Sequence, residues 1–355
     1  MVNRCERFKQ LLAENGIGAA FITRPEHMRY LSGYTGEGAL FVAQDAAVII
    51  TDFRYIEQAE RQSPDWTIAQ TTIDNKAPAI VLSLLNARAI NKLHFEADVM
   101  TVSEYEGLRD ELSGIEFISI PNIIATMRKV KDQHEIDCII AAGKIACAAF
   151  EELLTFVKPG MTERQIQQHL DFTMLQMGSE QNAFDTIAAA GPNGSLPHAT
   201  PSDRPVQVGE LLTLDFGAQV DGYKCDMTRT IAFGEISDEL KAIYDAVYEA
   251  QRLAYEGIKP GANCKAIDAI ARDYLEGLYP GAFGHSLGHG VGLQIHETPN
   301  FSMRCEEDLL PGHVMTVEPG VYIKGLGGCR IEDMAIITKD GYINPITVPR
   351  TLTTV

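Results

Sequence analysis

The chain has 355 residues, of which 45% are hydrophobic, so it is long enough to bury a core in each of two domains of ordinary size. Its formal net charge is -18, with 48 acidic and 30 basic residues, and such a surface disfavours nucleic acid as a partner because it would repel phosphates. No apolar stretch approaches the roughly 20 residues that cross a membrane, and the charged opening residues lack the apolar core of a secretory signal, so the sequence predicts a soluble protein without a membrane partner.

The first third of the chain predicts a small α/β domain. A helix with Phe8, Leu11 and Leu12 on one face should end near Gly16. The later pattern predicts strands over residues 19–23, 39–43, 47–51, 92–96 and 116–120, with a helix over 102–112. Because proline ends a strand, Pro121 marks the end of this domain, and we place the junction near residue 124. The predicted domains therefore span residues 1–124 and 125–355.

Charged residues open the second domain. The basic run Arg128-Lys129-Val130-Lys131 is interpreted as a solvated helix start rather than a binding patch. A periodic helical pattern follows, up to Ala148.

The second domain contains an internal duplication, with three collinear matches about 100 residues apart. The matched elements are Lys158-Pro159-Gly160 with Lys259-Pro260-Gly261, His198-Ala199-Thr200-Pro201 with His296-Glu297-Thr298-Pro299, and Gly209, Thr213, Asp215 and Gly217 with Gly312, Thr316, Glu318 and Gly320. Two halves built alike, related by a pseudo-two-fold axis, would place matched residues at one site.

A carboxylate lies inside an apolar strand pattern in each half. Burying Asp215 costs several kcal/mol unless a cation or donors compensate. The turn signal Asp221-Gly222 predicts a hairpin that pairs residue 220 with 223 and 217 with 226. In that register Asp215 and Asp226 are diagonal neighbours on one face, close enough to share one metal or bridge two. Cys225 would point to the opposite face and pack there.

The second half supplies two more such acids, Glu318 and Glu332, and four converging acids need more than one cation. Between the halves, His289 lies in a glycine-rich segment whose backbone could pass close to a ligand, and it is the best imidazole candidate. Four carboxylates and one imidazole form an oxygen-rich set that favours Mn²⁺, with Co²⁺, Fe²⁺ or Zn²⁺ as alternatives. Five other histidines have no motif around them and are interpreted as surface or core residues: His27, His94, His134, His169 and His313.

These residues stand in the order and spacing of a known family. The motifs are Leu214-Asp215-Phe216-Gly217, Asp226 eleven residues after Asp215, Gly288-His289-Gly290, His296-Glu297, Glu318-Pro319-Gly320 and Arg330 with Glu332. Over essentially its whole length the chain resembles the pita-bread metallopeptidases, especially aminopeptidase P and the Xaa-Pro dipeptidases (prolidases). The runs Tyr30-Leu31-Ser32-Gly33 and Asp52-Phe53-Arg54-Tyr55 resemble the creatinase-type amino-terminal domain of such enzymes.

The resemblance implies a mixed α/β (α+β) fold, a creatinase-type domain followed by a pita-bread catalytic domain, and a two-metal site. It implies that Asp215 and Asp226 chelate one ion, that His289 ligates the other, and that Asp226 and Glu332 bridge. Glu318 would be both ligand and proton acceptor. Outside the ligands, the resemblance implies that His198 and His296 stabilise the developing oxyanion, that His285 lies beside the residue on the proline side, and that Arg330 and Tyr322 orient the metal-bound groups.

The expected activity is hydrolysis of the bond between an amino-terminal residue and proline, on small peptides with proline in second place. Methionine aminopeptidase activity, metal-free hydrolysis of the creatinase type and a non-catalytic peptide-binding module are the alternatives. Archaeal dipeptidases of this family place an arginine where this chain has Asn300, so a clamp for the free carboxylate of proline is missing unless Arg304 folds back to replace it. We therefore expect longer Xaa-Pro peptides to be accepted.

Cellular context follows from the cysteines and the resemblance. The seven cysteines have no C-x-x-C spacing, which argues against a disulfide framework and favours a reducing cytoplasm. Relatives of this kind commonly form dimers, so a homodimer is expected.

Overall fold

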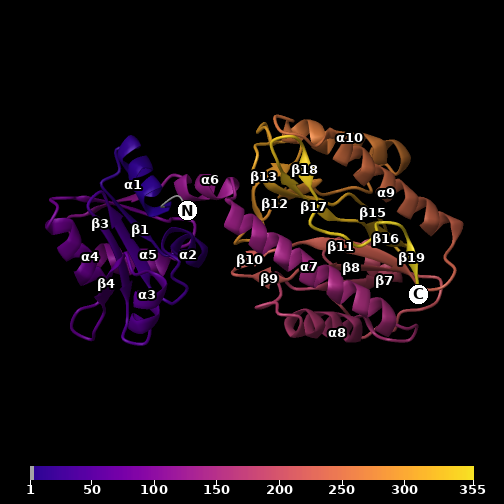
Figure 1. Cartoon of the computed structure of the whole chain (residues 1–355), viewed down its shortest axis with the longest axis horizontal. Coiled ribbons are helices and arrows are strands. Elements are labelled where there is room, and N and C mark those ends of the chain that lie inside the picture. The colour runs from indigo at the N-terminus through magenta and orange to yellow at the C-terminus, as the bar shows by residue number, and fades with distance from the viewer. Residues whose placement is uncertain (1–3) are drawn as a thin grey trace. The chain divides into compact units, whose positions relative to one another are not determined.

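The computed structural model describes residues 4–355, which divide into two compact units with the boundary between residues 128 and 129 (Figure 1). The predicted junction near residue 124 falls inside helix α6, whose bounds are Ile123–Lys129.

The first unit is a six-stranded mixed sheet with helices. Its strands lie in the order β4-β3-β2-β1-β5-β6, and the β1–β2 and β2–β3 pairs are antiparallel while the others are parallel. The elements are α1 (Arg4–Glu14), β1 (Ala19–Ile22), α2 (Pro25–Ser32), β2 (Ala39–Ala43), β3 (Ala46–Thr51), α3 (Ile56–Gln62), β4 (Thr67–Gln70), α4 (Ala77–Asn86), β5 (Lys92–Phe95), α5 (Val102–Glu111), β6 (Glu116–Ser119) and α6. All five predicted strands and both predicted helices are present, with ends that differ by at most two residues.

The second unit has a similar order of elements in each half, as the duplication predicts, with the 3₁₀ helix η1 of the first half in the place of strand β13 of the second. The first half has α7 (Gln133–Phe156), α8 (Glu163–Gln176), β7 (Ile187–Ala190), the 3₁₀ helix η1 (Gly191–Ser195), β8 (Leu211–Phe216), β9 (Gln219–Val220), β10 (Tyr223–Lys224) and β11 (Met227–Ala232). The second half has α9 (Asp238–Gly257), α10 (Cys264–Leu278), β12 (Gly288–Gly290), β13 (Glu297–Phe301), β14 (Val314–Val317), β15 (Gly320–Ile323), β16 (Gly327–Arg330) and β17 (Asp333–Ile337), followed by β18 (Tyr342–Ile343) and β19 (Thr353–Thr354).

Each half begins with a helix pair joined by a Lys-Pro-Gly turn. The second helix of each pair is capped, by Thr162 in α8 and by Asn263 in α10, whose side chains accept hydrogen bonds from backbone N–H groups in the first turn. The strands lie between the α7–α8 pair and the α9–α10 pair, with α8 against β7 and α9 against β14 to β16 (Figure 1). They form a sheet of order β19-β11-β8-β7, a sheet of order β13-β12-β14-β17-β18 and two separate strand pairs, β9–β10 and β15–β16.

The hairpin that carries two of the candidate acids has the predicted register. Tyr223 pairs with Val220 across the turn, and Met227 pairs with Phe216 beyond it, so neither strand has an extra residue between these pairs. Asp221 has the positive φ of 46° that a two-residue turn of this kind requires. Cys225 is fully buried, which agrees with its interpretation as a packing residue.

Arg229 of β11 ties distant segments of this unit together. Its guanidinium is buried and contacts the Asp333 carboxylate at 2.6 Å. It also donates to the carbonyl oxygens of Glu332, Val348 and Pro349, at 2.7, 2.9 and 3.0 Å. These acceptors offset the cost of burying the guanidinium charge. The same contacts join β11, β17 and residues 348–349 into one unit, which we call the Arg229 block.

None of the helices in residues 4–355 is long and apolar enough to span a membrane. All seven cysteines lie in this range, and they are not joined in disulfides.

Candidate metal centre

A cavity of about 560 Å³ in the second unit is lined by both halves of the duplication. All five predicted metal ligands line it: Asp215, Asp226, His289, Glu318 and Glu332. Four of the five predicted outer residues, His198, His285, His296 and Arg330, also line it, whereas Tyr322 contacts it through its hydrogen bonds to Arg330 and His285. The structure therefore gathers the whole predicted set.

The four acids converge because the two sheets meet at one backbone bridge. Asp215, in β8, lies opposite Thr228 of β11, and Thr228 in turn bridges to Glu332, which immediately precedes β17. The Glu332 N–H donates to the Thr228 carbonyl oxygen at 3.0 Å, and the Thr228 hydroxyl donates to the Glu332 carboxylate at 2.7 Å. The continuous register of the hairpin then places Asp226 diagonally across from Asp215.

His289 faces these carboxylates with one defined nitrogen. Its Nε2 lies 3.3 Å from Glu318 Oε1 and 3.6 Å from Asp226 Oδ2. Its Nδ1 is 3.0 Å from the carbonyl oxygen of Gly290, so Nδ1 carries the proton and Nε2 can act as a ligand. Ligand atoms of Asp226, His289 and Glu332 all lie within 4.8 Å of one another.

The glycines on either side of His289 serve strand packing. A Cβ atom on Gly288 would lie 2.0 Å from the carbonyl oxygen of Thr316 in β14, and one on Gly290 would lie 2.9 Å from that of Glu297. No side chain fits at either position. The absence of a side chain lets β12 pass between β13 and β14, and the expected approach of this backbone to a ligand stays a prediction.

Arg330 supplies a positive charge next to Asp215. Its side chain is buried, and it donates to Asp215 Oδ2 at 2.7 Å, to the Tyr322 hydroxyl at 2.8 Å and to the Pro197 carbonyl oxygen at 3.1 Å. Tyr322 continues this chain of contacts to His285 Nε2 at 3.0 Å. Arg330 thus fixes the orientation of one acid and, through Tyr322, of one cavity histidine.

The remaining predicted residues lie at the open side of the cavity. His198 follows η1, and His296 precedes β13, and both residues are exposed. The His296 ring makes an edge-to-face contact with His289, with 4.5 Å between the ring centres. These two histidines come from matched positions of the duplication, and both can reach a ligand in the cavity.

Comparison with known proteins agrees with this geometry. The family described as Metallopeptidase family M24 matches residues 137–339, and the Creatinase/Prolidase N-terminal domain matches residues 4–130. The chain belongs to metallopeptidase family M24.

Three similar proteins align over nearly the whole chain. A structure of the Xaa-Pro dipeptidase from Bacillus anthracis is 40% identical with a TM-score of 0.95, and covers 99% of each chain. The X-Pro aminopeptidase from Thermotoga maritima is 34% identical with a TM-score of 0.91, over 99% of this chain and 100% of that one. The Xaa-Pro dipeptidase of Pyrococcus furiosus is 35% identical over 344 residues, 96% of this chain and 97% of that protein. The predicted two-domain organisation, a creatinase-type domain followed by a pita-bread domain, is confirmed.

An M24 centre holds divalent metal ions, and the residues of this centre fit them. Three buried carboxylate oxygens have no hydrogen-bond partner among the described residues: Asp215 Oδ1, Asp226 Oδ1 and Glu332 Oε1. Leaving three such acceptors buried would be costly, and cations among them would remove that cost.

The electrostatics of the M24 centre show the same need for cations. Burial, and then the charges of neighbouring acids, raise the pKa of Asp226 and the pKa of Glu332 well above their usual range. Burial opposes ionisation of Glu318 too, but its hydrogen bond with His289 outweighs that effect and lowers the pKa of Glu318. The same contact outweighs burial at His289 and raises its pKa to about 9. The cluster attracts positive charge at neutral pH.

Two threonines that sequence reasoning passed over hold the ligands in place. The Thr228 hydroxyl contacts Glu332 and accepts from Arg330 Nε at 3.1 Å. The Thr316 hydroxyl accepts from the backbone N–H of His289 at 2.9 Å and donates to Glu318 Oε1 at 3.1 Å. Thr316 belongs to the repeated set of the duplication, and that repetition is the signal by which it could have been found.

The interpretation of the basic run at residues 128–131 as solvated was wrong. Arg128 and Lys131 are buried, and Lys131 Nζ lies 3.1 Å from Glu297 Oε2, with both side chains almost fully enclosed. Glu297 also accepts from the backbone N–H of Gln294 at 3.0 Å, so this ion pair anchors the segment that carries His296. Sequence alone could not show this, because the two charges are 166 residues apart.

Proposed function

We propose that this chain removes an amino-terminal residue that precedes proline, with two divalent ions held by Asp215, Asp226, His289, Glu318 and Glu332. The observation that carries the proposal is the convergence of four carboxylates and one imidazole nitrogen on one cavity, in a chain whose full-length relatives are named Xaa-Pro dipeptidase and X-Pro aminopeptidase. Two bound divalent ions lower the pKa of water and so supply a nucleophile near neutral pH. The oxygen-rich ligand set favours Mn²⁺.

Glu318 is the proposed proton acceptor. Its lowered pKa keeps it ionised at neutral pH, and it lines the cavity, so it can take a proton from the attacking water and deliver it to the leaving nitrogen. His198 and His296 would donate hydrogen bonds to the oxygen of the attacked carbonyl group. The ring of His296 is partly enclosed by the cavity wall although the residue is exposed overall. This desolvation, and then the nearby His289, lower the pKa of His296, so at neutral pH it is a neutral donor.

Proline is a demanding leaving group for a general peptidase. Its amide nitrogen carries no N–H, so an enzyme cannot hold that bond through the usual donor and instead needs a surface for the ring. Phe184, Ile187 and Ile295 give the cavity an apolar side where the pyrrolidine ring would pack, with His285 beside it.

The direct test is hydrolysis of an Xaa-Pro peptide and of its Xaa-Ala counterpart by the Mn²⁺-loaded protein, with the bound metal measured. Release of the first residue from the proline peptide alone, lost after chelation, supports the proposal. A methionine aminopeptidase would cleave Met-Ala peptides instead, and a non-catalytic peptide-binding module would bind either peptide without cleaving it.

Substrate length depends on the positive charges around the cavity. Among the described residues that line it, Arg330 is the only arginine, and its guanidinium is already engaged by Asp215, Tyr322 and Pro197. Asn300 lines the cavity, whereas Arg304 does not. No guanidinium of the lining residues is thus available to capture the free carboxylate of a dipeptide, and the proposal is an enzyme closer to aminopeptidase P than to a strict dipeptidase.

We expect kcat/KM for an Xaa-Pro-Yaa tripeptide to equal or exceed that for the matching Xaa-Pro dipeptide. The reason is that none of the described lining residues has a guanidinium available to bind the free carboxylate of proline. Steady-state kinetics on paired peptides would measure this. A preference of about a hundredfold or more for the dipeptide, abolished by Arg304→Ala, would overturn the assignment, since it would place Arg304 on the substrate carboxylate.

We expect His198→Ala and His296→Ala to lower kcat by roughly 10² each while both metal ions stay bound, because these side chains act on the transition state and not on the metals. His169→Ala is the matched control, since that histidine stacks on Phe156 away from the cavity. A rise in KM with unchanged kcat would mean that the two histidines only bind substrate.

The proposal extends to domain extents and assembly. We propose a creatinase-type domain over residues 1–124 and a catalytic domain over residues 125–355, in a cytoplasmic homodimer. Light scattering on the purified protein tests the dimer.

A further inference from the structure

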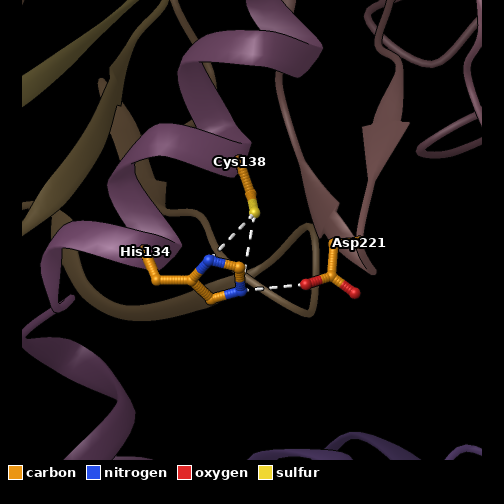
Figure 2. Close-up of side chains that lie close together, drawn as sticks. All are labelled: His134, Cys138 and Asp221. Carbon is orange, nitrogen blue, oxygen red and sulfur yellow. Dashed lines mark hydrogen bonds and ion pairs between the residues drawn. The ribbon is translucent and has the colours of Figure 1, made fainter. Parts of the chain in front are cut away.

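Three metal-ligating side chains meet outside the catalytic cavity (Figure 2). His134 Nε2 lies 2.9 Å from Asp221 Oδ2 and 3.8 Å from Cys138 Sγ. One ligand atom from each residue lies within 4.8 Å of the other two. None of the three residues lines the catalytic cavity, and no step of the proposed reaction uses them.

Two of the ligands share one face of a helix. His134 and Cys138 stand four residues apart at the start of α7, which places their side chains one above the other. Both point toward the turn between β9 and β10, as Figure 2 shows. The His134 ring also makes an edge-to-face contact with Tyr223, with 6.4 Å between the ring centres.

The third ligand comes from a turn that is itself fixed. Asp221 occupies the positive-φ position of the β9–β10 turn. The backbone N–H groups of Asp221 and Gly222 donate to the Glu180 carboxylate, at 3.1 and 2.9 Å. Because Glu180 accepts the hydrogen bonds of the turn's backbone N–H groups, the turn is held in place without a metal. The Asp221 carboxylate therefore faces α7 before any cation binds.

We propose that His134, Cys138 and Asp221 form a second metal site, which takes a zinc-type divalent cation with water as the fourth ligand. Bonds of about 2.0 to 2.3 Å in a tetrahedral zinc site place ligand atoms roughly 3.3 to 3.8 Å apart. The Nε2–Sγ separation of 3.8 Å fits this range, and Nε2 and Asp221 Oδ2, hydrogen-bonded at 2.9 Å, would have to move slightly apart when a cation binds between them. One nitrogen, one sulfur and one oxygen form a borderline set that suits Zn²⁺ or Co²⁺, whereas the all-oxygen and imidazole set of the catalytic centre suits harder ions. A thiolate and a carboxylate would balance the charge of the cation.

Such a cation would link the start of α7 to the hairpin that connects two catalytic carboxylates. Asp215 lies in β8, which leads into β9 of this hairpin, and Asp226 lies between β10 and β11. A metal at the turn would therefore stiffen the segment that sets the distance between these two acids, without entering the cavity.

Cobalt distinguishes the two sites, because only the proposed one contains a thiol. The Mn²⁺-loaded full-length protein is titrated with Co²⁺ under reducing conditions, and thiolate-to-cobalt charge-transfer absorption is followed in the near ultraviolet. We expect this band to saturate at one cobalt ion per chain. Cobalt that replaces manganese in the catalytic centre adds no such band, since all of that centre's ligands are carboxylates and an imidazole.

Variants assign the band to its ligands. Cys138→Ser should abolish it, and His134→Ala and Asp221→Asn should each weaken cobalt binding by at least about tenfold. Cys305→Ser is the matched control and should keep the band. His134 is exposed, so His134→Ala tests the site even where Cys138→Ser lowers stability.

Three results would overturn the site. They are the absence of a charge-transfer band, a band that survives Cys138→Ser, and an affinity for cobalt that is unchanged in both His134→Ala and Asp221→Asn. The last result would mean that cobalt binds the cysteine alone. None of these readouts depends on peptidase activity, so failure here leaves the proposed function untouched.

Discussion

Glu332→Gln is expected to abolish peptidase activity and, in the metal-free protein, to raise the melting temperature. The loss of activity should reach at least about a thousandfold, which corresponds to roughly 4 kcal/mol of transition-state stabilisation. The reason is that glutamine keeps the size of the native side chain but loses its charge, so the ligands left behind no longer balance two dications. Metal analysis should show less than two ions per chain.

The gain in stability follows from the raised pKa of Glu332. Burial, and then the neighbouring Asp226, raise that pKa, so the folded metal-free protein binds a proton at this site more tightly than the unfolded chain does. The stabilising effect of the protonated group is complete below the unfolded carboxyl pKa, about 4, and is lost as the pH rises through the raised folded value. At neutral pH the ionised group destabilises the metal-free fold, and glutamine removes that effect.

The test is specific because Glu332→Gln should lower peptidase activity and at the same time raise the melting temperature of the metal-free protein. Thermal unfolding after chelation, at pH 7 and again near pH 5, should show the variant more stable at the higher pH and the difference shrinking at the lower one. Asp171→Asn is the control for activity and metal content, because Asp171 is a half-buried acid that does not line the cavity. Full activity and two bound ions in Glu332→Gln would remove Glu332 from the ligand set.

Lys131→Met should destabilise the protein by about 3–5 kcal/mol, because it leaves the buried carboxylate of Glu297 without its cation. Lys129→Met is the matched control. Lys129 pairs with Glu307 at 2.7 Å, but Glu307 is half exposed, so this loss should cost no more than about 1 kcal/mol. Urea unfolding of the metal-loaded variants at one Mn²⁺ concentration would measure both.

A double variant separates the charge from the packing. Lys131→Met with Glu297→Gln should recover a large part of the loss, since it removes the second charge as well. The single variant should also lower kcat, because Glu297 adjoins His296. Equal effects of Lys131→Met and Lys129→Met would contradict a buried ion pair.

Where local rules act, the sequence predicted how the candidate metal ligands come together. The Asp221-Gly222 turn fixes the register of its hairpin, and that register alone brings Asp215 and Asp226 together. The duplication then indicates that Glu318 takes the place of Asp215 in the second half. Each step uses neighbouring residues or a repeated spacing, so no knowledge of tertiary contacts is required.

Contacts between distant segments could not be predicted in this way. The bridge between Thr228 and Glu332 depends on how two sheets meet, and the burial of Lys131 depends on where β13 packs. His134 shows the same limit of local rules: without a motif around it, the sequence indicates a surface histidine, and only the fold brings Asp221 beside it. The charge and polarity of a residue do not indicate which residue from a distant segment will contact it in the folded chain.

The Arg229 block has a consequence for the order of folding. Its acceptors at Asp333, Val348 and Pro349 lie 104 to 120 residues further along the chain. Closing loops of that length is entropically costly and slow, and until they close the guanidinium lacks most of its acceptors. The helix pairs, which depend on short-range contacts, should therefore form first, and β17 should dock late. Because Glu332 immediately precedes β17, the metal centre becomes complete only in that late step, and refolding chains should regain helical signal before they can retain Mn²⁺.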